Sequence, residues 1–423
     1  MNYQVFKLAN GLQVICAPMQ ETKAVAIEIS VGTGSRFEKP DKQGLAHFLE
    51  HMFFKGTFKR PTTLDISREL DSVGAFYNAY TSEEQTGFWI KAPFEHFQLG
   101  LDTLFDILFN SKFDKAEVEK EKGVILEEIN MYQDTPQSYV LDVAKELFYG
   151  QQPLGWSVAG TKQTVPKLTQ DDLISFRDGL YTPENMIITV AGKGEPKDWL
   201  AKISQCFSKI KTKSDKKLIK VTEKQTQPSV KIHYKKTDQA HLVLAFRGIK
   251  RTDERRPTLR VLNNILGETM SSFLFTEVRE KRGLAYYISS DYWDFIETGA
   301  IGAAAGVDLN KIQDAIPVIL EQFNRFKTAK IPKNEIDRAK ENLKGRLYLS
   351  LEDCSSTATF LGDSLMFWGK IKDAEEVVKE TMAVSSADIQ ALAKQLFLPG
   401  GLNLAMVAPF KNEIDFLKIL ERF

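Results

Sequence analysis

The feature that most constrains the fold is a repeat, because both halves of the chain carry the same order of secondary-structure signals. Each half runs strand, strand, helix, strands, helices, strand, as judged from apolar residues at every second position or at every third to fourth position. The closing strands also match, since residues 185–192 read Asn-Met-Ile-Ile-Thr-Val-Ala-Gly and residues 403–409 read Asn-Leu-Ala-Met-Val-Ala-Pro. The repeat predicts a duplicated α+β domain.

The predicted duplication divides the chain into two domains of similar size. At 423 residues the chain is too long for one hydrophobic core. We place the first domain at 1–210 and the second at 228–423, each a mostly antiparallel sheet packed with helices. Residues 211–227 are rich in Lys, Thr, Ser and Gln and poor in apolar residues, which predicts a solvated linker between the domains.

A helical stretch at 44–54 carries the first chemical signal, His-x-x-Glu-His in Gly-Leu-Ala-His-Phe-Leu-Glu-His-Met-Phe-Phe. His47, Glu50 and His51 share one helical face, because residues three and four apart lie together. Two imidazoles and a carboxylate on one face are two metal ligands and a base, in the inverted order of the His-Glu-x-x-His zinc motif known as the inverzincin pattern. The corresponding helix of the second half, 258–267, has no His. The duplication therefore predicts chemistry in one copy only.

The sequence also limits where a third metal ligand can come from. A catalytic zinc ion takes three protein ligands and leaves a position for water. The three cysteines, Cys16, Cys206 and Cys354, form no CxxC pair, which argues against a cysteine site and for a reducing compartment. We expect a carboxylate from the long acidic helix predicted at 114–133. Spacing alone does not choose among its candidates, which are Glu117, Glu119, Glu121, Glu127 and Glu128.

Four separated stretches follow a pattern that occurs in one enzyme family. The first is the His motif followed downstream by Glu-Glu at 127–128, and the second is Asn-Ala-Tyr-Thr-Ser at 78–82. The third is a loop at 266–273, less glycine-rich than its counterpart in the family, and the fourth is Arg-Glu-Lys-Arg-Gly-Leu-Ala-Tyr at 279–286. In this order, over essentially the whole chain, they resemble the short two-domain bacterial type of the M16 zinc metallopeptidases, the family of pitrilysin, insulysin and the mitochondrial processing peptidase.

The resemblance implies a role for each matching side chain. Glu128, the second Glu of the pair, would be the third zinc ligand, and Glu121 would orient a ligand. Glu50 would be the general base that takes the proton from the attacking water. Arg279 and Tyr286 would donate hydrogen bonds to the charge that develops on the scissile carbonyl. The alternative for these last two is a surface salt bridge and a core aromatic.

The resemblance also implies how a substrate is held. An extended peptide would add to an edge strand through main-chain hydrogen bonds, which favours unfolded peptides over particular side chains. Longer family members carry four such domains, so a two-domain chain would form half of a clamshell and work as a dimer. A homodimer is self-sufficient, and a heterodimer with a sister subunit is the alternative. The residues of the edge strand that would pair with the substrate are Asn78, Ala79, Tyr80 and Thr81.

Two other functions fit a chain of this family. A non-catalytic structural subunit would keep the fold and lose the site residues, which are intact here. A dedicated processing peptidase would cut one precursor rather than many peptides. Lys plus Arg and Asp plus Glu are 56 each, which gives no support for nucleic-acid or membrane-surface binding. Without a leader or a long apolar run, we expect a cytoplasmic metalloendopeptidase with one zinc ion per chain.

Overall fold

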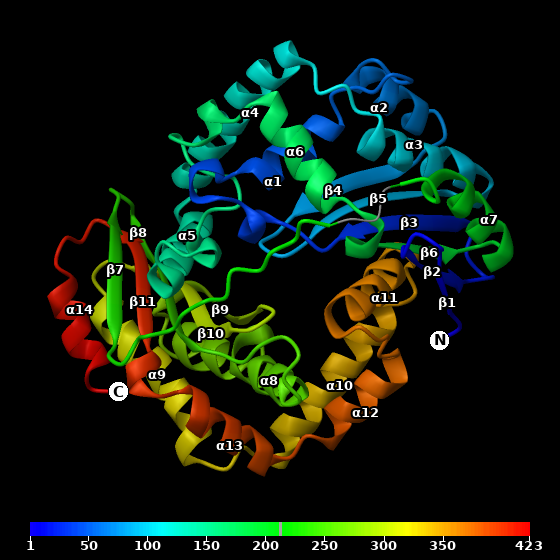
Figure 1. The fold of residues 1–423 in the computed structure, drawn as a ribbon. Helices are drawn as coiled ribbons and strands as arrows, with labels where there is room; N and C mark the ends of the chain where they lie inside the picture. Colours follow the sequence, from blue (N-terminus) through cyan, green and yellow to red (C-terminus); the bar gives the residue numbers. More distant parts are fainter. Residues whose placement is uncertain (211–213) are drawn as a thin grey trace. The chain divides into compact units, whose positions relative to one another are not determined.

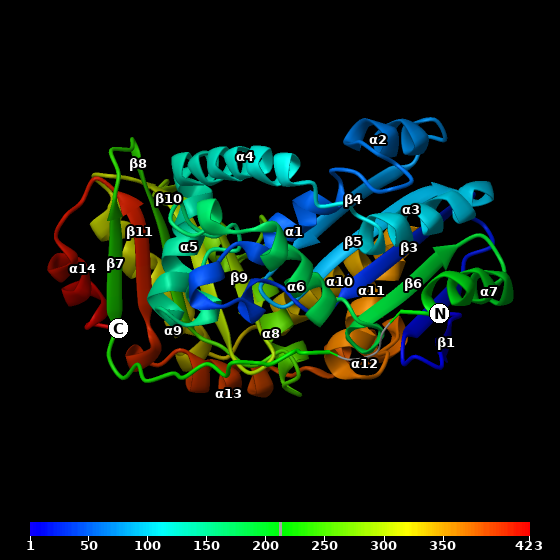
Figure 2. The ribbon, with the colours of Figure 1, turned by 45° about the horizontal axis from the view of Figure 1, so that its top comes forward.

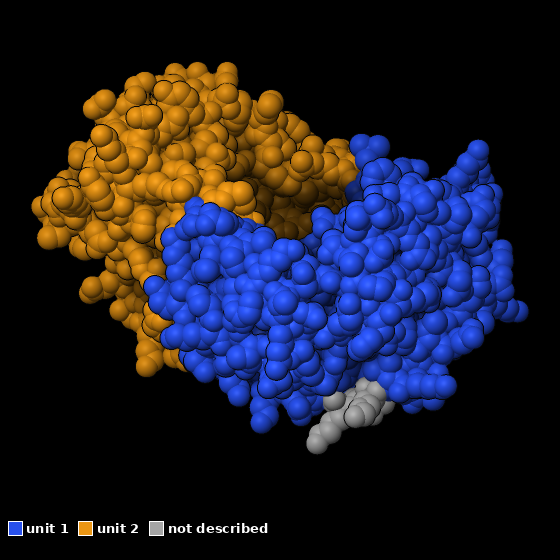
Figure 3. Space-filling view, turned by 90° about the horizontal axis from the view of Figure 1, so that it is seen from above, with its two compact units in different colours: residues 1–130, 156–219, 348–373 blue, residues 131–155, 220–347, 374–423 orange. Residues whose placement is uncertain are grey.

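The computed structural model describes residues 1–210 and 214–423, and it contains two compact units (Figure 3). The first three residues of the predicted linker at 211–227 lie outside the described part. Each unit includes one segment from the opposite half of the sequence, an exchange that our contiguous domain boundaries do not include. Unit 1 consists of 1–130, 156–219 and 348–373, and unit 2 consists of 131–155, 220–347 and 374–423.

Unit 1 is built on a six-stranded sheet in the order β1-β2-β6-β3-β5-β4 (Figure 1). Only β2 and β6 run parallel, and every other neighbouring pair is antiparallel. The central strand β6 is buried along its whole length, which its unbroken small and apolar sequence allows. At one side β4 is a free edge. The strands are β1 (Gln4–Lys7), β2 (Gln13–Pro18), β3 (Ala24–Val31), β4 (Phe76–Thr81), β5 (Thr86–Pro93) and β6 (Met186–Gly192).

Helices cover both faces of this sheet (Figures 1 and 2). A large core forms between one face and the helices α1 and α3. On the other face α11 lies against β3 and β6 in a second, smaller core. The helices assigned mainly to unit 1 are α1 (Leu45–Phe53), α2 (Thr63–Asp71), α3 (Phe97–Phe109), α4 (Lys115–Asp134), α6 (Gln170–Leu180), α7 (Pro196–Phe207) and α11 (Cys354–Trp368).

Unit 2 repeats this plan with a five-stranded sheet in the order β7-β11-β8-β10-β9. Again one pair, β7 and β11, is parallel and the rest are antiparallel. The strand order matches unit 1 without β1, which confirms the predicted α+β duplication. The strands are β7 (Ser229–Tyr234), β8 (Gln239–Arg247), β9 (Ala285–Asp294), β10 (Gly299–Asp308) and β11 (Asn403–Ala408).

The helices of unit 2 also pack on both faces of their sheet. One core lies between the sheet, α8, α9 and α13, and α5 packs on β8 and β11 on the other side. Neither α12 nor α14 was expected from the sequence pattern. The helices assigned mainly to this unit are α5 (Pro136–Tyr149), α8 (Arg256–Asn263), α9 (Ile312–Thr328), α10 (Lys333–Ser350), α12 (Ala374–Ala383), α13 (Ser386–Leu396) and α14 (Glu413–Leu420).

The exchanged helix α11 is fixed to the sheet of unit 1 by packing and by polar contacts. Ala358 and Leu361 are fully buried against the sheet. Gly362 lies so close to β6 that a Cβ atom there would stand 3.0 Å from Thr189 Oγ1. The hydroxyl of Thr359 donates to the buried carboxylate of Glu28 at 2.5 Å. Residues 348–373 are therefore part of the core of unit 1, although they come from the second half of the chain.

Two further expectations can be compared with the structure. None of the three cysteines forms a disulfide, as their scattered positions predicted. Among the helices within the described residues, none is both long enough and apolar enough to cross a bilayer.

Candidate metal and catalytic site

The His-bearing helix α1 begins at a strained glycine and a buried carboxylate. Gly44 has φ +91°, and a Cβ atom there would stand 2.8 Å from Ala159 O, so only glycine fits. Gly44 has no side chain with which to cap the helix. Instead Glu38 accepts from the backbone N–H of Gly44 at 2.9 Å and of Ala46 at 2.7 Å. Burial raises the pKa of Glu38 to about 8 against these hydrogen bonds.

The apolar side of α1 determines where its polar side points. Six residues of this helix are buried in the core of unit 1, and His47, Glu50 and His51 are the partly exposed remainder. Burying the apolar stripe thus holds both imidazoles and the Glu50 carboxylate on one face. The buried residues are Leu45, Ala46, Phe48, Leu49, Met52 and Phe53.

The structure brings His47, His51 and Glu128 together. One ligand atom from each lies within 4.8 Å of the other two. His47 Nε2 is 3.7 Å from Glu128 Oε1, and His51 Nε2 is 3.5 Å from Glu128 Oε2. Because α4 carries Glu128 toward α1, the candidate third ligand that spacing alone left open lies opposite both rings. This donor set, two imidazole nitrogens and a carboxylate oxygen, suits a catalytic zinc ion.

The protonation tendencies of the two imidazoles differ. Burial, with a smaller contribution from the neighbouring His51, lowers the pKa of His47 to about 3, so this ring is neutral and ready to bind a cation. Burial also acts to lower the pKa of His51, but the hydrogen bond to Glu121 and the charges of Glu128 and Glu50 outweigh it and raise that pKa. A metal ion would therefore compete with protons more at His51 than at His47.

Glu121 orients His51 from behind. Its Oε1 lies 2.8 Å from His51 Nδ1, and its Oε2 lies 2.6 Å from Lys55 Nζ. Burial raises the pKa of Glu121, but the hydrogen bonds from His51 and Lys55 outweigh it and lower that pKa. An ionised carboxylate only accepts, so His51 Nδ1 carries the hydrogen and Nε2 keeps its lone pair for a metal. No such partner holds His47, whose Nδ1 is buried without a hydrogen bond in the described part of the chain.

Glu50 stands apart from the ligand cluster and is held by the edge strand. The hydroxyl of Thr81 in β4 donates to Glu50 Oε2. Burial raises the pKa of Glu50, while the Thr81 hydrogen bond lowers it. Sequence reasoning placed Thr81 in the substrate strand and missed this contact. The signal for it was the alternation of β4, which turns the side chains of Tyr77, Ala79 and Thr81 to the same face.

The rest of β4 presents a free backbone edge beside the site. Asn78 Oδ1 accepts from the N–H of Ala79 at 2.9 Å. Tyr80 points to the opposite face, where its hydroxyl donates to Glu28 at 3.2 Å. A hollow of about 280 Å³ lies against this strand, lined by Glu50, His51, Phe54, Lys55, Thr63, Ile66, Ser67, Tyr77, Asn78 and Glu121. Unit 1 therefore joins the ligand cluster, the base and an open strand edge.

Arg279 and Tyr286 belong to unit 2. Arg279 is exposed, and its guanidinium lies 5.0 Å from the ring centroid of Phe275. Tyr286 is 61% exposed at the start of β9. Neither side chain makes a hydrogen bond or ion pair within the described residues. These surroundings match neither the surface salt bridge nor the core aromatic that we considered as alternatives.

Comparisons with known proteins show which family the chain matches. Residues 13–162 match the model of the family described as Insulinase (Peptidase family M16), and residues 167–343 match the Peptidase M16 inactive domain. A Bacillus subtilis protein named as an uncharacterized zinc protease is 36% identical over 95% of this chain and 97% of its own. A Streptomyces coelicolor protein of the same description is 32% identical, over 96% and 89%.

Solved structures share the fold. A protease from Helicobacter pylori superposes with a TM-score of 0.91 at 22% identity, over 96% of this chain and 99% of that one. A Pseudomonas fluorescens structure described as a peptidase M16 inactive domain gives a TM-score of 0.90 at 18% identity, over 97% and 98%. The two-unit architecture is therefore common to these chains.

Proposed function

Because the chain belongs to peptidase family M16, we propose that it is a zinc-dependent endopeptidase acting on peptides or unfolded segments bound as an extended strand. The observation that carries this proposal is the convergence of His47, His51 and Glu128, with Glu50 beside them and not among the ligands. A structural subunit would not need a separate, hydrogen-bonded carboxylate next to three ligands. The two bacterial relatives are named zinc proteases, which supports the proposed activity.

One zinc ion per chain would be held by His47 Nε2, His51 Nε2 and a carboxylate oxygen of Glu128. When bound, zinc supplies Lewis acidity, which lowers the pKa of a water molecule and polarises the scissile carbonyl. The chain prepares this binding, because burial keeps His47 neutral and Glu121 fixes the tautomer of His51.

Glu50 is the proposed general base. With the Thr81 hydroxyl bound to Oε2, Oε1 is left to take the proton from the attacking water. As the C–N bond breaks, Glu50 passes this proton to the leaving amine nitrogen, and the other proton of the water remains on the new carboxyl group, which ionises at neutral pH. Burial raises the pKa of Glu50, which favours its acceptance of this proton.

The substrate would pair with β4 by replacing an internal contact. The N–H of Ala79, which now donates to Asn78 Oδ1, would donate to a substrate carbonyl, and Asn78, Tyr80 and Thr81 would line the same strand. Arg279 and Tyr286 would donate hydrogen bonds to the scissile carbonyl oxygen. Their exposure and lack of polar partners support this assignment.

The proposal extends to assembly and location. We infer a homodimer whose two copies form a chamber, in which each chain is half of a clamshell, and we place it in the cytoplasm because its three cysteines are free. A dedicated precursor-processing peptidase or a heterodimer is the second candidate. Gel filtration of the purified chain distinguishes the homodimer from the heterodimer, since only a homodimer forms from this chain alone.

The deciding experiment measures metal and cleavage together. The purified protein should contain one zinc per chain and cleave a mixture of quenched unfolded peptides, and a chelator should abolish cleavage until zinc is restored. Glu50→Gln should keep the zinc and lose the cleavage. Cleavage at the wild-type rate by Glu50→Gln would reject the proposal.

A further inference from the structure

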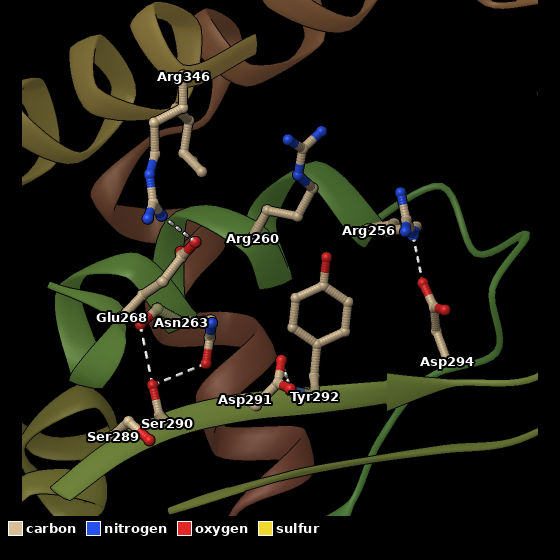
Figure 4. Close-up of a pocket in the computed structure, with 11 residues that line it drawn as sticks. Arg256, Arg260, Asn263, Glu268, Ser289, Ser290, Asp291, Tyr292, Asp294 and Arg346 are labelled. Carbon is tan, nitrogen blue, oxygen red and sulfur yellow. Dashed lines mark hydrogen bonds and ion pairs between the residues drawn. The ribbon is translucent and has the colours of Figure 1, made fainter. Parts of the chain in front are cut away.

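Unit 2 has a polar hollow at the place that corresponds to the candidate metal site of unit 1. It has a volume of about 600 Å³ and lies between β9, α8 and α10 (Figure 4). Every residue that lines it belongs to unit 2. The lining residues are Arg256, Arg260, Asn263, Glu268, Ser289, Ser290, Asp291, Tyr292, Asp294, Leu343 and Arg346.

The buried residues of the helices show which positions correspond. In α1 the buried pairs Phe48-Leu49 and Met52-Phe53 flank the polar residues, and Val261-Leu262 and Ile265-Leu266 are buried with the same spacing in α8 and the helical turn after it. The His47 position is then Arg260, and the Glu50 and His51 positions are Asn263 and Asn264.

The same comparison applies to α4 and α10. Glu128 follows the buried Ile125 by three positions, as Arg346 follows the buried Leu343. The Glu128 position is thus Arg346. The positions of the three candidate ligands and of Glu50 in unit 1 are held by two guanidiniums and two amides in unit 2, so this copy lacks the candidate metal-ligand set of unit 1.

Most charges of the hollow are already paired. Arg346 forms an ion pair with Glu268 at 2.6 Å, and Arg256 forms one with Asp294 at 2.6 Å. Arg260 forms neither a hydrogen bond nor an ion pair within residues 1–210 and 214–423. In Figure 4 it rises from α8 between the other two arginines, and no dashed line reaches it.

Two neighbours determine what Arg260 could bind. The Tyr292 hydroxyl, which has no hydrogen-bond partner among the described residues, stands below Arg260 in Figure 4. Asp291 opposes an anion by its charge, but its Oδ1 accepts the edge N–H of Tyr292 at 2.8 Å. The guanidinium of Arg260 can donate two parallel hydrogen bonds, and the Tyr292 hydroxyl can donate one more. This arrangement of donors beside an open strand edge suits the two oxygens of a carboxylate.

We propose that this hollow is a subsite for a carboxylate of the bound peptide, either an Asp or Glu side chain or the C-terminus, with Arg260 as its anchor and Tyr292 as a second donor. This inference rests on the proposed peptidase function. Tyr292 is six positions from Tyr286 along β9, which is roughly 20 Å at the rise of a strand. The recognised carboxylate therefore belongs to a residue about six positions from the cleaved bond.

The test scans one Glu, against Gln, along an otherwise uncharged quenched peptide. Wild-type enzyme should show a lower KM, by about tenfold, for Glu at one position near six residues from the cut, with kcat unchanged. Arg260→Met should remove this preference, and Arg260→Lys should keep part of it. Arg422→Met, which removes an exposed arginine outside the hollow, should keep all of it.

A binding measurement separates this inference from the proposed function. Calorimetry on Glu50→Gln, with and without Arg260→Met, compares the Glu peptide, the Gln peptide, C-terminally amidated forms and inorganic phosphate. Tighter binding of the Glu peptide or of the free C-terminus that depends on Arg260 supports the subsite, even if no peptide is cleaved. Equal binding of the Glu, Gln and C-terminally amidated peptides, or Arg260-dependent binding of phosphate alone, overturns it.

Discussion

Glu121 Oε1 lies 2.8 Å from His51 Nδ1, and this contact turns the other ring nitrogen of His51 toward Glu128. The carboxylate is 2% exposed and is also bound by Lys55. A buried acceptor with two donors has little freedom to move. His51 is consequently fixed in ring orientation and in tautomer before any metal arrives.

Weakening this contact should weaken zinc binding without removing a ligand. Glu121→Gln keeps an acceptor for His51 but loses the charge that Lys55 neutralises, so we expect zinc affinity to fall by at least tenfold. Competition with a fluorescent chelator measures this. Glu119→Gln, on the same helix but exposed and paired only with Lys122 among the described residues, is the control and should leave affinity unchanged. Equal affinities in both variants would contradict the role of Glu121.

The choice between the two adjacent glutamates of α4 gives a sharper test of the ligand set. Glu128 faces His47 and His51, whereas Glu127 is exposed and lies outside the cluster. Glu128→Gln should lower zinc content and abolish cleavage, while Glu127→Gln should do neither. Metal analysis after dialysis, with peptide cleavage in parallel, checks both. Equal zinc content in the two variants would remove Glu128 as a ligand.

The sequence predicted elements and the metal motif well because both depend on local periodicity. Helix α2, for example, begins at a capping box formed by Thr62 and Asp65, a contact between residues three apart in the sequence. The exchange of α5 and α11 between sheets could not be predicted, since it depends on which apolar face meets which sheet. Periodicity shows that Ala358 and Leu361 are buried, but not that they lie against β-strands of the first half.

The same limit applies to the site. The spacing of His47, Glu50 and His51 follows from one helix, so the motif alone placed them together. Contacts between distant elements have no complete local signal: the alternation of β4 shows which face Thr81 shares, but not that this face meets Glu50, and nothing local pairs Glu38 with the start of α1. Glu128 was identified through resemblance to a family, and its geometry became visible only when α4 and α1 were placed in one unit.

The buried carboxylate of Glu28 predicts a pH dependence of stability. Burial raises the pKa of Glu28 to about 7, above its ordinary 4.5. The folded chain therefore binds a proton that the unfolded chain releases between these values, so its stabilising contribution is complete below about pH 4.5 and is lost as the pH rises through 7. We expect a difference on the order of 2–3 kcal/mol between pH 5 and pH 8.

Denaturant unfolding of the wild type and of Glu28→Gln at both pH values tests this. The neutral amide cannot ionise, so the free energy of unfolding of the variant should increase relative to that of the wild type as the pH rises. Glu184→Gln, at an exposed carboxylate of the same unit, should follow the wild-type profile. A stability difference between wild type and Glu28→Gln that does not change with pH would show that Glu28 is ionised throughout.

The hydrogen bond from Thr81 to Glu50 predicts a kinetic effect that a purely structural threonine would not have. Thr81→Val preserves the shape of the side chain and the backbone edge but removes the donor, so Glu50 loses the contact that fixes Oε2 and orients Oε1. Because the base acts in the transition state, we expect kcat to fall about tenfold with KM and zinc content unchanged. Thr81→Ser keeps a hydroxyl and should restore most of kcat. Steady-state kinetics on one quenched peptide decides the point, and a change confined to KM would mean that Thr81 serves substrate pairing instead.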